Sequence, residues 1–417
     1  MIHQRVYLLS IFLAFIFTNL VFSQRDNCDC KADLAFLDAK IKKTTTSYKN
    51  NKNAYNASLA RISILAEKTT SIYDCYVLLN TLMLSLSDNQ SRIYGTDNGA
   101  TKEVKSDSIK YAAFKNAPIY NLYPILKIDL DSLESVLNSK AVADVEGVYS
   151  LKDYITIGFF KDEASAQFKT VVLDSKTDLW KRGELVSTAI PFGNKYLSMM
   201  SGSYTTKKLE AYTERVDNGM FHFMGLTKNQ NIIRYPTAIS KDSIFFREEL
   251  TPEITYIRLG SFNSWYPTLR EAENFYKQLN GTLTKPNLIV DLRNNGGGGD
   301  RNSDIVYKLL KTYSKKNKIY VLINHRTGSN AEQCAYKLSK LNNCEIYGQY
   351  TNGVVGYEIK NGFYDLPSGH FIAVLTSKTC TAYVDLESKG VQPDFELSLD
   401  SDWIEQTIKL IQEKSKD

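Results

Sequence analysis

The stretch VLINHRTGSNAEQ, residues 321–333, joins an apolar run to a polar turn and then to the start of a helix. The apolar run is typical of a buried strand, and Ser329 lies where the turn meets the helix. Residues 329–332 fit a capping box, in which the serine oxygen accepts from the N–H of Glu332 and the glutamate reaches back. The same position suits a nucleophile, because a helix N-terminus favours developing negative charge. The motifs around Ser329 are needed to choose between a helix cap and a nucleophile.

Strands and helices alternate on both sides of this stretch, from residue 251 onward. ITYIRLGSF (254–262), NLIVDLRNN (287–295) and KIYVLINHR (318–326) have strand character, and PTLREAENFYKQLN and NAEQCAYKLSKL have helical character. This alternation predicts a mainly parallel sheet covered by helices, with residues 251–417 as one α/β domain. Ligands of such sheets bind at the carboxyl ends of the strands, and Ser329 follows such an end.

Two regions of different character precede this domain. Residues 31–140 are predicted to form a helical N-terminal domain, with the apolar run CYVLLNTLMLSL (75–86) buried nearly all round. Residues 145–248 contain runs rich in Tyr, Phe and Val between turn residues, which predict a β-rich domain, either a sandwich or a barrel. Carbohydrate or lipid binding by this second region remains an open alternative that rests on architecture alone.

The N-terminus has the pattern of a signal peptide. Residues 1–23 carry the apolar run YLLSIFLAFIFTNLVF and end in small residues at the cleavage positions. The run is shorter than a comfortable membrane span, and no later stretch has transmembrane character. We therefore expect an exported protein, periplasmic or secreted, with no integral membrane segment after cleavage. The formal charge of +5 on 417 residues is too small to indicate a nucleic-acid partner.

The sequence encodes no evident metal or cofactor site. Six cysteines are too few and too scattered for a disulfide scaffold in a chain of this length. Cys28 and Cys30 lack the spacing of a zinc knuckle, and only three histidines follow residue 23. We therefore expect neither a metal nor a cofactor.

A glycine-rich loop, NNGGGGD at residues 294–300, follows one of the predicted strands. Its glycines allow the backbone to present N–H groups outward. A phosphate site is disfavoured, because the loop has no Gly-Lys-Ser/Thr ending and Asp300 would repel an anion. Two alternatives remain: a loose turn, or an oxyanion hole in which the loop acts together with the N–H of Asn330.

Five ordered motifs give this region a family resemblance. YIRLGSF, NLIVDLRNNGGG, VLINHRTGSNAE, GQYTNG and ESKGVQPD, within residues 251–399, resemble the S41 peptidases, which include C-terminal processing (tail-specific) and tricorn-like proteases. The resemblance implies a crotonase-like (ClpP/crotonase-type) α/β domain and a polypeptide substrate. It also implies that Ser329 is the nucleophile that forms an acyl-enzyme, and that Gly297 and the amide of Asn330 form the oxyanion hole. The oligomeric state stays open.

Both general bases of the family are replaced in this sequence. The resemblance to processing proteases implies a lysine in a Thr-x-Gly-Lys motif after the serine. In this sequence the matching motif is Thr351-Asn352-Gly353, and Val354 stands in place of the lysine. Tricorn-like members carry a histidine where the stretch SLSDNQSRI places Gln90. A third family element, a glutamate before Gly-Val-x-Pro-Asp, corresponds to Glu387. A glutamine can orient a hydroxyl but does not accept its proton near neutral pH.

Other residues are candidates for the missing base. His325 lies four residues before Ser329, and Glu387 could serve if burial raised its pKa. His370 and Lys378 lie farther along the chain without support from a motif. Two hypotheses follow: an exported serine peptidase whose catalytic residues are Ser329, Glu387 and Gln90, or a catalytically impaired pseudopeptidase that binds peptides or partners.

Overall fold

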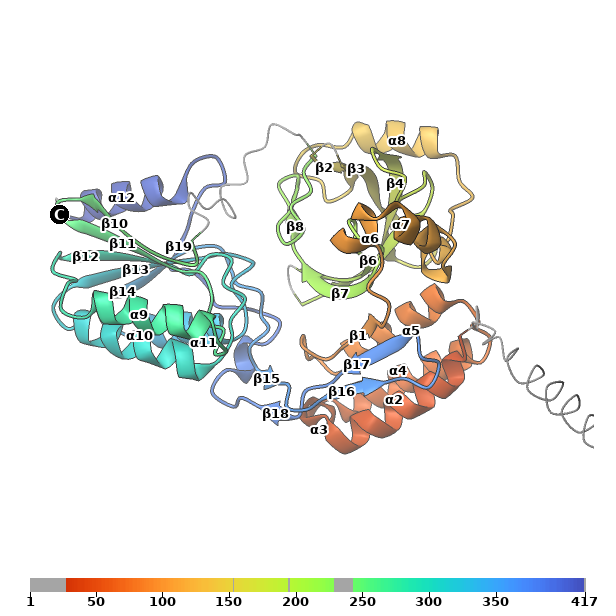
Figure 1. Cartoon of the computed structure of the whole chain (residues 1–417), viewed down its shortest axis with the longest axis horizontal. Helices are drawn as coiled ribbons and strands as arrows, with labels where there is room; N and C mark the ends of the chain where they lie inside the picture. The colour runs from red at the N-terminus through yellow and green to blue at the C-terminus, as the bar shows by residue number, and fades with distance from the viewer. Residues whose placement is uncertain (1–27, 153, 194–195, 229–242, 416–417) are drawn as a thin grey trace, which may run out of the picture.

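The computed structural model describes residues 28–152, 154–193, 196–228 and 243–415. The segment expected to be a signal peptide, residues 1–23, lies outside these ranges. In the described part, no helix combines the length and the hydropathy that a membrane span requires. Figure 1 shows three groups of elements: N-terminal helices, a meander of strands beside them, and a separate sheet with helices on both faces.

The N-terminal group begins with helices that are capped and cross-linked. The helices are α2 (Cys30–Thr44), α3 (Thr46–Asn50), α4 (Lys52–Ala66) and α5 (Ile72–Leu84). The side chains of Asp29 and Ser71 accept hydrogen bonds from the first turns of α2 and α5, which defines where these helices begin. A disulfide between Cys30 and Cys75 joins α2 to α5. The scattered cysteines therefore form one cross-link between two helices rather than a scaffold.

A six-stranded antiparallel meander follows in sequence order. The segment between α5 and the meander contains β1 (Arg92–Gly95), α6 (Lys102–Ser106), α7 (Ser108–Lys115), η1 (Pro118–Asn121) and α8 (Leu130–Asn138). The meander consists of β2 (Gly147–Leu151), β3 (Ile155–Asp162), β4 (Gln167–Ser175), β5 (Leu185–Phe192), β6 (Tyr196–Gly202) and β7 (Leu209–Glu214). A hairpin of β8 (Val216–Asp217) and β9 (Met220–Phe221) completes it. The strand character predicted for this region is thus realised as a single meander.

The N-terminal helices and the meander share one hydrophobic core, although the sequence suggested two separate regions. Tyr73 of α5 packs on Tyr123, which packs on Trp180, with ring centroids 5.8 and 4.7 Å apart. Phe371, from far along the chain, belongs to the same cluster. It arrives on β17 (Phe371–Val374), which pairs between β1 and β16 (Phe363–Asp365). Part of the expected 251–417 domain therefore packs with the N-terminal group.

The C-terminal sheet has six strands in the order β10-β11-β12-β13-β14-β19. They are β10 (Phe245–Thr251), β11 (Ile254–Leu259), β12 (Asn287–Asp291), β13 (Lys318–Ile323), β14 (Cys344–Gly348) and β19 (Phe395–Glu396). All neighbours from β11 to β19 are parallel, which confirms the predicted parallel, mixed α/β arrangement. Only β10 is antiparallel. It pairs with β11, although its residues were expected mostly within the β-rich region that ends at residue 248.

Helices cover both faces of this sheet (Figure 1). One face packs on α9 (Thr268–Leu279), α10 (Asp300–Tyr313) and α11 (Asn330–Ser339). The other packs on α12 (Trp403–Lys414), whose Trp403 is fully buried among sheet tyrosines. Because both faces are covered, the central strands contain continuous buried runs, at residues 288–290 of β12 and 319–323 of β13. The remaining short elements, β15 (Tyr357–Glu358), β18 (Lys378–Thr379) and η2 (Val384–Leu386), lie between β14 and β19 in the chain.

Candidate active site

Ser329 and the glycine-rich loop lie side by side because β12 and β13 are parallel neighbours that end at the same edge of the sheet. Two hydrogen bonds join the loops that follow these strands. The side-chain oxygen of Asn324 accepts from the N–H of Asn294 at 3.0 Å, and the N–H of Gly328 donates to the carbonyl oxygen of Asn295 at 2.9 Å. The asparagines of the two motifs therefore fix the position of Ser329 relative to the glycines.

The backbone of Ser329 is strained. Its φ of 52° and ψ of −124° place it in a region that side-chain-bearing residues rarely adopt. Such a conformation costs on the order of 1–3 kcal/mol and persists only where the surroundings enforce it. Here the N–H of Ser329 donates to Oε2 of Glu332 at 2.8 Å, and its carbonyl oxygen accepts from the N–H of Glu332 at 2.9 Å. The glutamate's half of the predicted capping box is thus formed.

Glu332 also connects the serine turn to a second loop. Its fully buried carboxylate accepts from the hydroxyl of Thr351 at 2.5 Å and from the N–H groups of Gly353 and Val354 at 2.7 and 3.0 Å. Burial raises the pKa of Glu332 to about 7, against the lowering effect of these donors. Val354, which occupies the position of the family lysine, is therefore fixed near Ser329 through the same carboxylate.

Gly297 brings the glycine-rich loop into contact with the serine turn. Its φ is 97°, and a Cβ built on it would lie 2.8 Å from the backbone nitrogen of Asn330 and 2.9 Å from Cβ of Ser329. Only glycine fits there. The N–H of Gly297, however, donates to the side-chain oxygen of Asn295 at 2.9 Å. In the described part of the chain, the N–H of Asn330 has no acceptor. Of the two predicted oxyanion donors, the amide of Asn330 is thus the available one.

A cavity of about 360 Å³ opens beside Ser329. It is lined by Asn89, Gln90, Arg92, Tyr94, Ala211, Tyr212, Thr213, Phe223, Gly296, Ser329, Asn352, Val354 and Ile359. The structure therefore places Gln90 in the same cavity as Ser329, although the two residues are 239 positions apart in the sequence. The Nε2 of Gln90 donates to the carbonyl oxygen of Tyr357. Gln90 comes from the N-terminal group, so the cavity is assembled from distant parts of the chain.

The turn that carries Gln90 is organised by Asp88. Its buried carboxylate accepts from the N–H groups of Gln90 at 2.9 Å and Ser91 at 3.1 Å. It also accepts from the hydroxyl of Ser47 on α3 at 3.1 Å. An aspartate that satisfies backbone donors in this way stabilises a tight turn. The stretch SDNQS thus folds locally into the turn that delivers Gln90 to the cavity.

Glu387 lies behind the cavity rather than in its lining. Its carboxylate accepts from three backbone N–H groups: Asn89 at 2.7 Å, Val355 at 2.9 Å and Gly356 at 2.6 Å. Burial raises its pKa to about 7. The contact with Asn89 holds the residue next to Gln90. Glu387 is therefore placed to position the Gln90 segment, and within the described ranges no hydrogen bond joins it to Ser329.

His325, the predicted alternative base, has other partners. It is buried, stacks on Tyr196 with centroids 5.3 Å apart, and its Nε2 lies 3.4 Å from the carbonyl oxygen of Thr213. Burial, followed by the charge of His222, lowers its pKa to about 3. In the described part of the chain, no hydrogen bond joins it to Ser329, and it does not line the Ser329 cavity.

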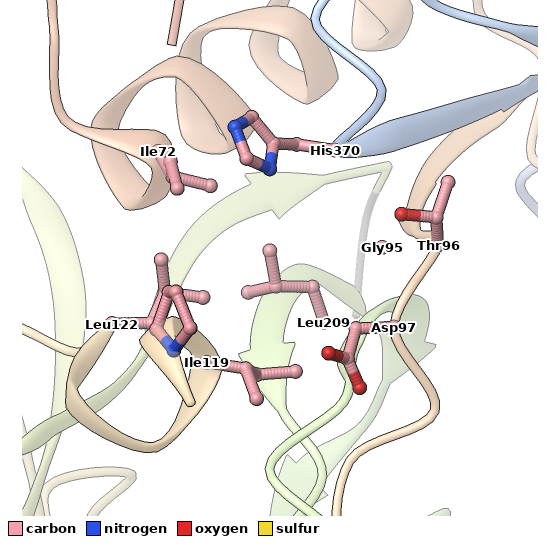
Figure 2. A pocket seen from close by; sticks show the side chains of 9 residues that line it. Ile72, Gly95, Thr96, Asp97, Ile119, Leu122, Leu209 and His370 are labelled. Atoms are coloured by element: carbon pink, nitrogen blue, oxygen red, sulfur yellow. The ribbon is translucent and has the colours of Figure 1, made fainter. Parts of the chain in front are cut away.

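The other two basic candidates also lie elsewhere. His370 borders a separate cavity of about 160 Å³ together with Ile72, Asp97 and Leu209, as Figure 2 shows. Lys378 forms an ion pair with Glu358 at 2.9 Å. Neither residue lines the Ser329 cavity within the described ranges.

Sequence reasoning missed several lining residues, above all Arg92, Tyr212 and Thr213. One signal was available: Gln90 and Arg92 are two positions apart, so in an extended segment their side chains project to the same side. No sequence pattern could have indicated Tyr212 and Thr213 on β7, because they reach the cavity only through the contact of β7 with β1, a segment far away in the sequence.

Potential metal ligands gather at one place in the described part of the chain, and it is far from Ser329 in the fold. Cys28, Asp33 and Cys75 lie close enough together to offer ligands. However, the sulfur of Cys75 is bonded to Cys30. A disulfide sulfur is not a thiolate ligand, so this group does not fit a metal ion.

The sequence pattern of peptidase family S41 matches residues 253–314 and 301–397. This range contains Ser329, the glycine-rich loop and Glu387, but not Gln90. No curated protein sequence matches the chain.

Several solved structures are similar at low sequence identity. A photosystem II D1 C-terminal processing protease is 15% identical, with 89% of this chain and 94% of that one covered and a TM-score of 0.37. A putative peptidase from Parabacteroides merdae is 13% identical, with coverages of 92% and 97% and a TM-score of 0.41. The tricorn protease is 14% identical, with coverages of 93% and 37% and a TM-score of 0.44. Because these TM-scores are below 0.5, the structural similarities carry no argument, and the link to family S41 rests on the sequence match at residues 253–397.

Proposed function

From the match of residues 253–397 to peptidase family S41, we propose that the chain belongs to this family and is a serine-type peptidase that hydrolyses polypeptides through an acyl-enzyme at Ser329. The observation that carries the proposal is the strained backbone of Ser329 at the mouth of a cavity. A serine that only capped α11 would need neither the strain nor the cavity. Strain that is maintained by several hydrogen bonds is typical of functional residues.

In the proposed reaction, the Ser329 hydroxyl attacks the carbonyl carbon of the peptide bond. The N–H of Asn330, and a second N–H from the glycine-rich loop, would hold the oxyanion of the tetrahedral intermediate. The C–N bond then breaks and the amine leaves with the proton that the Ser329 hydroxyl gave up. Water next attacks the ester, which releases the peptide's new carboxyl group and restores the Ser329 hydroxyl. We propose that Gln90 orients the hydroxyl and that Glu387 positions Gln90 through Asn89. None of the described residues that line the cavity has a side chain that is a base near neutral pH, so we expect slow turnover.

The same absence favours a second candidate, the pseudopeptidase. The described lining contains neither a histidine nor a lysine, and without a base a serine hydroxyl is a weak nucleophile. In this alternative, the cavity binds an extended peptide and releases it unchanged.

A fluorophosphonate probe tests the two candidates on the purified mature protein. We expect one adduct by intact mass, absent in Ser329→Ala and retained in Ser139→Ala, a control at an exposed serine after α8. Labelling that persisted in Ser329→Ala would contradict the assignment of the nucleophile. A folded wild-type protein that took no label would contradict peptidase activity and favour the pseudopeptidase.

We also propose that the parallel sheet and its helices represent the crotonase-like fold of the family, and that the protein is exported. The Cys30–Cys75 disulfide supports export, because such bonds persist in oxidising compartments. Mass analysis of the protein from the exported fraction would test the expected cleavage after residue 23.

A further inference from the structure

The Ser329 cavity has an unusual charge distribution. Among its lining residues in the described part of the chain, Arg92 is the only one with a charged side chain. The rest are aromatic, apolar or neutral polar residues, including Tyr94, Tyr212 and Phe223. No carboxylate faces the interior, so the positive charge of Arg92 is not cancelled there.

Arg92 is buried, with 8% of its surface exposed, and its hydrogen bonds go to neutral oxygens. Its Nε donates to the carbonyl oxygen of Asn89 at 2.7 Å, and its Nη2 donates to the side-chain oxygens of Asn89 at 3.3 Å and Thr213 at 2.5 Å. Within the described ranges, none of the ion pairs includes Arg92. Its guanidinium is thus oriented by neutral groups and left without a counter-ion.

Two other buried cations in the described part of the chain are paired, whereas Arg258, which is also buried, likewise has no ion pair there. Lys207 contacts Glu184 at 2.9 Å, and Arg293 contacts Asp291 at 2.7 Å. A buried cation without a counter-ion is costly, because desolvation is not offset by attraction to a nearby anion. Arg92 differs from Arg258 in that it lines the Ser329 cavity, where an anion could reach its guanidinium.

The acidic groups nearest to Arg92 are engaged elsewhere. Asp88 and Glu387 favour its charged form from a distance. Asp88 already accepts from the N–H groups of its own turn, and Glu387 accepts from three backbone N–H groups. An arginine remains protonated even when burial lowers its pKa, as it does here. The charge of Arg92 is therefore available to an anion that enters the cavity.

We propose that Arg92 is a specificity-determining residue that binds a carboxylate of the peptide held in the Ser329 cavity, an inference that rests on the proposed function of that site. Two carboxylates of a peptide could supply the anion: an Asp or Glu side chain near the scissile bond, or the C-terminal carboxylate. Tyr94, Tyr212 and Phe223 would contact the apolar atoms beside it. A guanidinium binds carboxylates with strong, directional hydrogen bonds.

Binding to the Ser329→Ala protein tests the proposal without requiring turnover. The probe is an equimolar library of acetylated decapeptides, prepared once as free acids and once as C-terminal amides. Bound peptides are recovered by gel filtration and sequenced by mass spectrometry. The best binder is then synthesised with Asp or Glu replaced by the matching amide. We expect the carboxylate form to bind roughly 10-fold to 100-fold more tightly, as for hydrogen bonds to charged groups.

The two libraries distinguish the sources of the carboxylate. Enrichment of Asp or Glu in both libraries identifies a side chain, whereas binding confined to the free acids identifies the C-terminus. Adding Arg92→Gln to Ser329→Ala should abolish the preference, while adding Arg270→Gln, on the separate helix α9, should leave it intact. If Arg92→Gln does not fold, the preference of the Ser329→Ala protein for acids over amides, and its loss in high salt, remain decisive.

Several outcomes would overturn the inference: equal affinity for acids and amides, no retained peptide at all, or a folded Arg92→Gln protein that keeps the preference. An equal loss of cleavage rate for acidic and neutral peptides in Arg92→Gln would instead indicate a role at the oxyanion. Because binding is measured on Ser329→Ala, absence of fluorophosphonate labelling in the wild type would refute the proposed peptidase without deciding the role of Arg92.

Discussion

Ser329 combines backbone strain with access to a cavity, and the glycine-rich loop explains how both are maintained. The close approach of Gly297 leaves no room for a side chain between the loop and the serine turn. Asn324 and Asn295 hold the two turns together. The strain is therefore a property of the pair of loops, and it should have a measurable energetic cost.

Replacing Ser329 by glycine should relieve this cost. At a φ of 52° with a ψ of −124°, glycine is favoured over any residue with a side chain. We expect Ser329→Gly to have a free energy of unfolding at least about 1 kcal/mol above that of Ser329→Ala. Urea unfolding of the two variants measures this difference in the free energy of unfolding. Because both variants lack the serine hydroxyl, the effect of losing it cancels in the comparison. A more stable Ser329→Ala would contradict the strain.

Restoring a base at residue 90 should increase the reactivity of Ser329. Gln90 lines the Ser329 cavity, and histidine is the residue that the resemblance to tricorn-like members places there. A positioned general base contributes about 10²-fold to 10⁴-fold. We expect Gln90→His to accelerate fluorophosphonate labelling by about 100-fold at pH 8, with Gln90→Asn as the neutral control. An equal rate in both variants would show that residue 90 does not reach the hydroxyl.

Local motifs singled out the candidate site residues whose proposed roles depend on short-range geometry. Ser329 was recognisable from a strand, a turn and a helix start, and Gln90 and Glu387 from their positions in ordered motifs. Arg92 and Thr213 were not predictable, because their approach depends on β1 lying against β7. The hydrogen bond from the N–H of Gly297 to the side chain of Asn295 was equally unpredictable from the sequence, because it depends on the rotamer of Asn295.

Glu332 and Glu387 connect loops that belong to different elements. Glu332, on α11, holds the loop at residues 351–354, and Glu387 holds residues 355–356 together with the Gln90 turn. Each carboxylate accepts several backbone N–H groups, so these loops depend on two side chains for their hydrogen bonds.

Glu332→Gln should loosen the loops on both sides of the cavity. A carboxamide has one oxygen, and its NH₂ group would face donors that now meet the second carboxylate oxygen. We expect a loss of about 1–3 kcal/mol in the free energy of unfolding, together with loss of fluorophosphonate labelling. Glu345→Gln, at a half-exposed carboxylate, serves as the control. Unchanged stability in Glu332→Gln would contradict this bridging role.

Periodicity predicted the helices and the parallel strands well, because both faces of that sheet are covered and the apolar runs are unmistakable. It could not predict pairing partners. The strand at Phe245–Thr251 has an ordinary strand pattern, and only the structure shows that it pairs with β11. Likewise, nothing in the short strand Phe371–Val374 indicates that it joins β1, 276 residues earlier.

At the scale of the whole molecule, burial raises the pKa of three carboxyl groups in the described ranges, Glu214, Glu332 and Glu387, to about 7. In the unfolded chain these groups ionise near pH 4.3. The folded state therefore binds more protons, and the resulting stability, complete below pH 4.3, is lost as pH rises through 7. The lowered pKa of His325 acts in the opposite direction, but only below about pH 6.5.

We therefore expect the free energy of unfolding to fall between pH 6.5 and pH 8, by on the order of 1 kcal/mol for each group. Urea unfolding at intervals of half a pH unit measures this decline. Glu387→Gln should flatten the profile, because it removes one titrating group. A profile that rose over this interval would contradict the predicted direction.

The hydrogen bond between Asn89 and Glu387 has a consequence for biosynthesis. Its two partners are 298 positions apart in the chain. Strand β1 likewise has no neighbour in its sheet until β17 has been synthesised. A ribosome makes the chain from the N-terminus at about 5–20 residues per second, so the cavity cannot close until nearly the last residues have emerged. A partly made chain therefore lacks the assembled Ser329 cavity, and the proposed activity would require nearly the whole chain.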